Sequence, residues 1–136
     1  MKVIEYRNEK LSHDMLSMLY KHLGNTTLYN EYVNAMGNYD VDINEYRVEE
    51  WIGFICVFKF PHLHYDVLLS ASTDDKFNKA MFKQIRSIIL SKKEEGRTLV
   101  IPSTEGNAPL VRATERLGGE FKQGDAWFNF YRKESI

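Results

Sequence analysis

The segment that decides the fold reads Ile101-Pro102-Ser103-Thr104-Glu105-Gly106-Asn107-Ala108-Pro109-Leu110 and continues to Gly118-Gly119-Glu120-Phe121. It has the order of a strand end, a short polar turn, an amphipathic helix and a glycine stop. Asn107 is a favourable helix N-cap, and Gly118 follows it by 11 residues, where a glycine in the left-handed conformation commonly ends a helix. The segment therefore predicts a strand–turn–helix unit, and it indicates a fold more strongly than a chemistry.

Length and composition indicate the number of domains and the classes of partner to expect. The chain has 136 residues, of which 43% are apolar and 27% charged, so we expect one domain over residues 1–136. The net charge of −1 gives no electrostatic reason to expect a nucleic acid partner. The apolar run Ile52–Phe60 is far shorter than the ~20 residues that span a bilayer. The lone cysteine, Cys56, lies in that run, which predicts a reduced, buried thiol and a protein made in a cytosol.

The N-terminal third predicts a short strand and two helices. Lys2–Tyr6 alternates polar and apolar residues, as a strand does. Ser12–Gly24 begins with an N-cap, carries apolar residues at helical spacing and ends on a glycine. Leu28–Gly37 fits a second helix ended by its glycine. Asn38–Asn44 is then expected to be a polar loop or an irregular strand.

No metal site is predicted. Asp40 and Asp42 resemble calcium ligands, but their segment lacks the glycine and the terminal glutamate of an EF-hand loop. His62 and His64 are two residues apart and have no third and fourth ligand at zinc spacing. We therefore expect these four side chains to be ordinary polar residues.

The middle of the chain changes to strand patterns. Tyr46 and Val48 fit one strand, and Trp51–Phe60 is near-continuously apolar, which is typical of a central strand. Tyr65–Ala71 follows after a short connection, which favours antiparallel pairing with Trp51–Phe60. The remaining expected elements are a long helix capped by Thr73 or Asp74 and ended at Gly96, a strand at Arg97–Ile101, and a final pair of strands at Phe121–Gln123 and Trp127–Tyr131.

The expected order of elements is β-α-α-β-β-β-α-β-α-β-β. It predicts an α+β fold in α/β/α layers, with a mixed central sheet of about 6–7 strands and about 4 helices. This order resembles the GNAT family of N-acetyltransferases, over residues 46–131 and, by element order, over the N-terminal third. The family often has Asn, a small residue, Tyr and Gly along its fourth helix. Asn107, Leu110, Thr114 and Gly118 stand at that spacing, and the first and last of them match.

The resemblance implies an acetyl-CoA site, with the cofactor's diphosphate on the N-terminus of the third helix and its arm along the preceding strand. The residues that would take these places are Leu69, Ser70, Ala71, Thr73, Lys76, Asn78, Lys79 and Asn107. The family's loop has Gln or Arg followed by two glycines, and here Thr73, Lys76 and Asn78 replace them. Asp74 and Asp75 add two carboxylates, which would repel a phosphate.

The catalytic positions that the resemblance implies are also altered. The family commonly uses a Tyr on the fourth helix as the acid toward the departing thiolate, and Thr114 in that place is a far poorer acid. Tyr131 and Tyr65 are candidate replacements. The candidate general bases are Glu45, Glu49, Glu50, Asp66 and His64.

Two functions follow from the resemblance. The first is a degenerate GNAT-fold protein without cofactor or catalysis, with a structural or binding role toward a protein partner. Gly106-Asn107, Arg112, Gly118 and Phe121 resemble the spacing in a small internal virion protein of short-tailed bacteriophages of the T7 type, which implies a virion-associated protein of the host cytoplasm. The alternative is an active acetyl-CoA-dependent N-acyltransferase that acts on a small-molecule amine. The acyl acceptor and the oligomeric state stay open.

Overall fold

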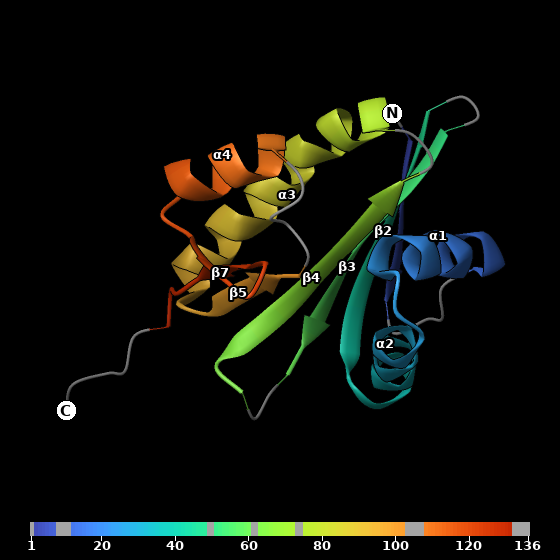
Figure 1. Ribbon diagram of the computed structural model, residues 1–136, viewed down its shortest axis with the longest axis horizontal. Coiled ribbons are helices and arrows are strands. Elements are labelled where there is room, and N and C mark those ends of the chain that lie inside the picture. Colours follow the sequence, from blue (N-terminus) through green and yellow to red (C-terminus); the bar gives the residue numbers. More distant parts are fainter. Residues whose placement is uncertain are drawn as a thin grey trace.

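Seven strands and four helices form the part of the chain that the computed structural model describes, residues 2–7, 12–48, 51–60, 63–72, 75–102 and 108–131 (Figure 1). In chain order they are β1 (Lys2–Arg7), α1 (His13–Leu23), α2 (Thr26–Asn38), β2 (Asp40–Val48), β3 (Trp51–Lys59), β4 (Tyr65–Ser72), α3 (Asp75–Glu95), β5 (Thr98–Ile101), α4 (Ala108–Arg116), β6 (Glu120–Lys122) and β7 (Asp125–Phe128). The predicted order and the α+β fold class are confirmed.

The strands form one mixed sheet with the order β1-β2-β3-β4-β5-β7-β6. Its described strand pairs are antiparallel except for β4 and β5, which are parallel. β3 lies between β2 and β4, and its residues from Gly53 to Phe58 are all buried, as its continuous apolar sequence predicts. The predicted antiparallel pairing of β3 with β4 is confirmed by a register that runs from Gly53↔Ser72 to Lys59↔Asp66.

Each face of the sheet carries its own hydrophobic core, because alternate residues of a strand point to opposite faces. The α1–α2 face is the one that packs against α1 and α2, and the α3 face packs against α3. The core of the α1–α2 face consists of Met15, Leu19, Val41, Ile43, Phe54, Cys56, Phe58, Val67, Leu69, Ala71 and Val100. The core of the α3 face consists of Tyr46, Ile55, Val57, Leu68, Met81, Ile85, Ile89, Leu99, Ile101, Ala126 and Phe128.

Capping residues set the ends of the first two helices. The Ser12 hydroxyl accepts a hydrogen bond from a first-turn N–H of α1, and Gly24 ends that helix with φ of 61°. Asn25 caps α2 in the same way. The predicted stop at Gly37 is wrong, because this glycine keeps the helical backbone and α2 continues to Asn38. A glycine ends a helix only where the chain takes the left-handed conformation.

Two stretches differ from the sequence-based expectation. The segment after α2 is predicted to be a polar loop or an irregular strand, yet Asp40 begins a regular strand that pairs with β1 on one side and β3 on the other. Buried Val41 and Ile43 alternate there with polar residues, which is a strand pattern. The last hairpin is also shifted. Gln123 and Gly124, with φ of 52° and 84°, form its turn, so β7 begins at Asp125.

The end of α4 is tightly packed. Gly118 ends the helix in the left-handed conformation, with φ of 80°, as predicted. The next residue, Gly119, lies against α4 and β7. A Cβ atom added to Gly119 would lie 2.6 Å from Thr114 Cγ2 and 2.8 Å from Phe128 Cε1. A side chain at this position would therefore have to displace two buried residues.

We expect Gly119→Ala to lower the free energy of unfolding by about 1–3 kcal/mol, because overpacking a buried contact strains both partners. Gly37→Ala is the matched control. A Cβ at Gly37 meets nothing within 4 Å, so this change should be neutral or should stabilise by up to about 1 kcal/mol, the difference in helix propensity. Urea denaturation measures both. Equal effects of the two changes would contradict the packing described at Gly119.

Candidate functional site

The parallel strands β4 and β5 separate after three residue pairs. Their ladder consists of Tyr65↔Thr98, Asp66↔Leu99 and Val67↔Val100, whereas β4 continues to Ser72. Beyond Val67, the described ladders of β4 are with β3 alone, and β4 runs away from β5 toward its arrowhead (Figure 1). We call the point at which the two strands part the β4–β5 fork.

Three of the predicted cofactor-binding residues lie at the fork. Leu69 and Ala71 point to the α1–α2 face and are buried in its core. Ser70 pairs with Ile55, so its half-buried side chain points to the α3 face. Because these side chains lie above and below the sheet, the group that the strand presents toward the fork is its main chain.

The N-terminus of α3 follows the end of β4. The helix begins at Asp75, so its first position carries a carboxylate residue. A helix N-terminus binds a diphosphate through free N–H groups and the positive end of the helix dipole, with small residues around it. The residue types found here do not fit that group. The predicted candidates whose side chains lie outside the described part of the chain are Glu49, Glu50, Thr73, Lys76, Asn78, Lys79 and Asn107.

Thr114, the candidate acid on α4, is enclosed in the protein. Only 1% of its surface is exposed, and its methyl group lies close to Gly119 on the α3 face. A general acid must reach the reacting atoms. The structure places Thr114 between α4 and β7, almost fully buried.

Tyr131 and His64 lie at the closed end of the parallel pair. Their rings stack with centroids 3.9 Å apart, and the Tyr131 N–H donates to Thr98 Oγ1 at 3.2 Å. Thr98 is the first residue of β5. Ala71 lies six residues beyond Tyr65 along β4, roughly 20 Å at about 3.3 Å per residue. Tyr131 therefore lies at the first pair of the ladder, Tyr65↔Thr98, two pairs before the strands part, and far from Ala71.

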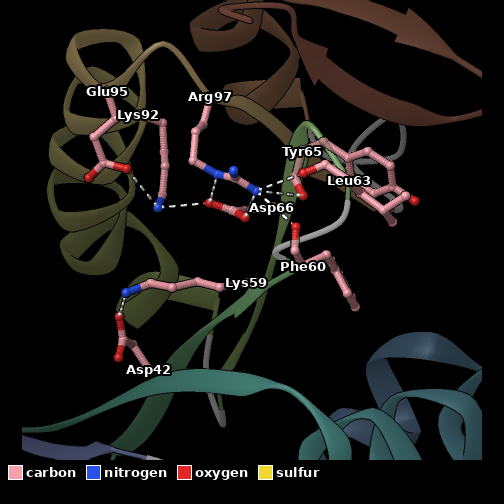
Figure 2. Close-up of polar contacts among 9 residues, drawn as sticks. All are labelled: Asp42, Lys59, Phe60, Leu63, Tyr65, Asp66, Lys92, Glu95 and Arg97. Carbon is pink, nitrogen blue, oxygen red and sulfur yellow. Dashed lines mark hydrogen bonds and ion pairs between the residues drawn. The ribbon is translucent and has the colours of Figure 1, made fainter.

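Asp66, a candidate base, is held in a buried ion cluster (Figure 2). Its side chain is 0% exposed and accepts two hydrogen bonds from Arg97, at 2.7 Å from Nη2 and 3.0 Å from Nε. Lys92 Nζ lies 2.9 Å from the same carboxylate and 3.3 Å from Glu95. Arg97 also donates to the main-chain carbonyl of Phe60 at 3.1 Å, which ties the β3–β4 connection to the cluster.

The cluster keeps Asp66 ionised. Burial raises the pKa of the Asp66 carboxyl, but the hydrogen bonds and charges of Arg97 and Lys92 outweigh it, so the pKa lies below its ordinary value of 3.8. A carboxylate that is bound on both oxygens by cations has little capacity to take a proton from a substrate. Glu45 is likewise buried, at 2% exposed, and forms an ion pair with Arg47 at 2.7 Å.

Three residues that sequence reasoning missed lie beside the fork on the α1–α2 face, together with Tyr65, which was a candidate acid. Tyr32 from α2, Tyr65 from β4 and Trp127 from β7 pack against the core of that face. The rings of Tyr65 and Trp127 lie 5.7 Å apart. Asp125 lies two residues before Trp127 on β7 and therefore on the same face. We call these four residues the aromatic–acid cluster.

The charge of Asp125 acts on Tyr32. Burial, followed by the negative charge of Asp125, raises the pKa of Tyr32 to about 12, so the phenol keeps its proton at neutral pH. Asp125 lies one residue before the Ala126↔Ile101 pair, at the end of β5 where β4 has already turned away. The spacing of Asp125 and Trp127 could have indicated a shared face, but no sequence signal indicates their approach to Tyr32.

Two pockets lie elsewhere on the described surface. One, of about 190 Å³, lies between β2, β3 and the end of α3, and both Lys92 and Glu95 line it. The other, of about 320 Å³, lies between α1 and α2 beside Tyr20 and Tyr29. Within the described residues, no group of three or more His, Cys, Asp or Glu is placed to hold a metal ion. No helix in that part of the chain is both long and apolar enough to cross a membrane.

Comparison with known proteins supports the fold. No protein-family model matches the chain, and no curated protein matches it by sequence. Among solved structures, a protein from Desulfovibrio desulfuricans that is assigned to the GNAT family of acetyltransferases is similar, with a TM-score of 0.53 and 15% identity over 95% of this chain and 99% of that one. At that identity the likeness shows a GNAT-type fold, and the activity has to be argued from the site.

Asp66→Asn should lower the free energy of unfolding by about 3–5 kcal/mol at neutral pH, because it leaves Lys92 and Arg97 without their buried counter-charge. The effect depends on pH. The folded-state pKa lies below the ordinary 3.8, so the stability contributed by this ionisation is complete above about pH 4 and is lost as the pH falls toward the folded-state pKa. Chemical denaturation between pH 7 and pH 3 should show the difference between wild type and variant shrinking.

Asp42→Asn is the matched control. The Asp42–Lys59 ion pair has a similar separation, 2.9 Å, but both side chains are 39% exposed. Its loss should cost no more than about 1 kcal/mol at any pH. A cost at Asp66 as small as that at Asp42 would show that the buried cluster does not hold β4, β5 and α3 together.

Proposed function

We propose that this protein is a GNAT-fold binding protein that does not transfer acetyl groups and that acts as a component of a bacteriophage particle. The observation that carries the first part is the position of its candidate acids and bases. The hydroxyl of Thr114 is enclosed under α4, Tyr131 lies at the closed end of the parallel strands, and Asp66 is bound on both oxygens by cations.

The start of α3 supports the same conclusion. In GNAT acetyltransferases, which this chain resembles, this helix end holds the diphosphate of acetyl-CoA. It begins here at Asp75, directly after Asp74, and Lys76 and Asn78 stand where glycines are expected. Carboxylates at a helix N-terminus satisfy its N–H groups and its dipole themselves, and they repel a phosphate.

The proposal of a virion role rests on the spacing of Gly106-Asn107, Arg112, Gly118 and Phe121. It can be tested by mass spectrometry of particles from a phage that encodes this chain. Peptides of the chain should be found in purified, nuclease-treated particles in stoichiometric amounts. Their presence in the lysate alone would contradict a virion role and would leave the binding function untouched.

A second function, acetyl-CoA-dependent N-acyl transfer, is favoured by one specific observation. β4 has no described strand partner on the β5 side beyond Val67, so its main chain could hydrogen-bond an extended ligand arm at the fork. Asp125, at the end of β5 and on the α1–α2 face, would then be the described carboxylate best placed to hold a proton from an amine. The misfit at the start of α3 ranks this function second.

Calorimetry with acetyl-CoA separates the two functions. We expect no heat of binding at millimolar ligand, because Lys76 and Asn78 replace the glycines and because Asp74 and Asp75 would repel a diphosphate. A dissociation constant below about 100 μM, roughly −5.5 kcal/mol, would overturn the non-catalytic function.

A double variant provides the control. Asp74→Gly combined with Lys76→Gly restores an open main chain ahead of α3. It should tighten acetyl-CoA binding if the protein uses the cofactor, and should leave acetyl-CoA unbound if it does not. Thermal unfolding of the double variant shows whether any change in binding reflects loss of the fold.

A further inference from the structure

The aromatic–acid cluster has the composition of a site for an organic cation. Tyr65 and Trp127 present two rings from neighbouring parts of the sheet, 5.7 Å apart and inclined at 55°. Both side chains are half-buried, so they combine contact with the core and access to solvent. Inclined aromatic rings with accessible faces attract a cation through the negative potential of their π-systems.

A cation of the chain itself already occupies this surface. The Lys122 ammonium lies 5.3 Å from the centroid of the Trp127 ring. Lys122 is the cross-strand partner of Asp125 on the β6–β7 hairpin, and its side chain is exposed. An exposed lysine is free to move away, since its long side chain gains rotamer entropy when it is released. The Trp127 ring is therefore a cation site with an internal occupant that a ligand could displace.

The second component is a negative charge on the same face. Asp125 lies on the same face as Trp127, and its charge reaches the hydroxyl of Tyr32 on α2. An ammonium ion over Trp127 would therefore share a face of the sheet with this carboxylate. A half-buried carboxylate acts on such an ion more strongly than a fully solvated one, because the local dielectric constant is lower.

We propose that the aromatic–acid cluster binds an alkylated ammonium group, and that this cation displaces Lys122 from the ring of Trp127. Binding of this kind needs no transferable N–H, so a quaternary ammonium should bind at least as well as a primary amine. The site uses the α1–α2 face of the sheet and makes no use of the N-terminus of α3. The proposed site therefore does not depend on whether acetyl-CoA binds on the other side of the fork.

The purely structural explanation of the cluster is that three aromatic residues complete the core and Lys122 covers Trp127. This explanation accounts for the rings. It also accounts for the carboxylate, because Asp125 lies directly across the hairpin from Lys122 and opposite charges at paired positions attract. The two explanations differ in the effect of removing the Lys122 charge. If Lys122 only covers the core, its loss should not create cation binding. If the cluster is a ligand site, its loss should strengthen the binding of a cation.

The probe is choline, with the uncharged 3,3-dimethylbutan-1-ol as its isostere. Titrations are followed through the indole N–H signal of Trp127 in NMR spectra of the full chain, assigned with Trp51→Phe. Choline should shift the Trp127 signal saturably, and the alcohol should bind about tenfold more weakly, because it lacks the charge that the rings attract. Equal binding of the two probes, or a choline shift that does not saturate, would overturn the proposal.

Two variants test the roles of the charged residues. Lys122→Met keeps the aliphatic stem and removes the competing ammonium, so choline binding should tighten about threefold or more, whereas Lys83→Met, an exposed lysine on α3, should change nothing. Asp125→Asn should weaken choline binding about threefold, whereas Asp42→Asn should not. No change in both Lys122→Met and Asp125→Asn would overturn the proposal. Melting temperatures close to wild type show that each variant is folded.

The source of the cation is distinguished by a third probe, the amide of Nα-acetyl-Nε-trimethyl-lysine. Tighter binding of this probe than of choline would identify a modified side chain of a protein as the source. The reverse order would identify a free small cation. Both results support an alkylammonium site, and failure of both probes to bind would overturn it.

Discussion

The buried carboxylate of Asp66 is the group on which the arrangement of β4, β5 and α3 depends. It belongs to β4, Arg97 immediately precedes β5, and Lys92 belongs to the last turns of α3, so one anion fixes three elements. Leaving one of these buried charges without its partner would destabilise the fold by several kcal/mol. The three elements therefore stay in the arrangement that keeps the charges paired. The cluster lies at the end of the parallel pair where the strands are hydrogen-bonded. The next pair, Val67↔Val100, is the last in the ladder, and beyond it β4 and β5 part. The fork is thus a structure held firmly at one end and left open at the other.

Much of the fold could be predicted because its signals are local. A side-chain cap at Ser12, left-handed glycines at positions 24 and 118, and a continuous apolar run in β3 each act within a few residues of the chain. The errors were also local, and each arose where two signals competed. Gly37 can end a helix or continue it, and the backbone that forms decides which. Asp40 to Asn44 carries both the polarity of a loop and the alternation of a strand, and pairing on both sides favours the strand.

The candidate site could be predicted far less well, because its chemistry depends on contacts between distant parts of the chain. In the sequence, Asp66 is one carboxylate among several. Only the structure shows that its charge is paired with Arg97, 31 residues later. Thr114 stands at a motif position, yet the fold buries it, with only 1% of its surface exposed. A motif gives the spacing of residues along one element. It does not give the burial or the charge partners that decide whether those residues can react.

The two sides of the fork therefore have different chemical characters, and the geometry of β4 explains how they can differ. Leu69 and Ala71 point to the α1–α2 face and Ser70 to the α3 face, so a ligand on one side meets none of the side chains on the other. The α3 side begins with a carboxylate residue at the helix start and encloses Thr114, which leaves little for a phosphate or a thiolate to use. The α1–α2 side presents aromatic rings, a protonated phenol and a carboxylate, which suit a cation. Because the sheet separates these two sets of residues, the side chains on one face can change without altering the chemistry of the other.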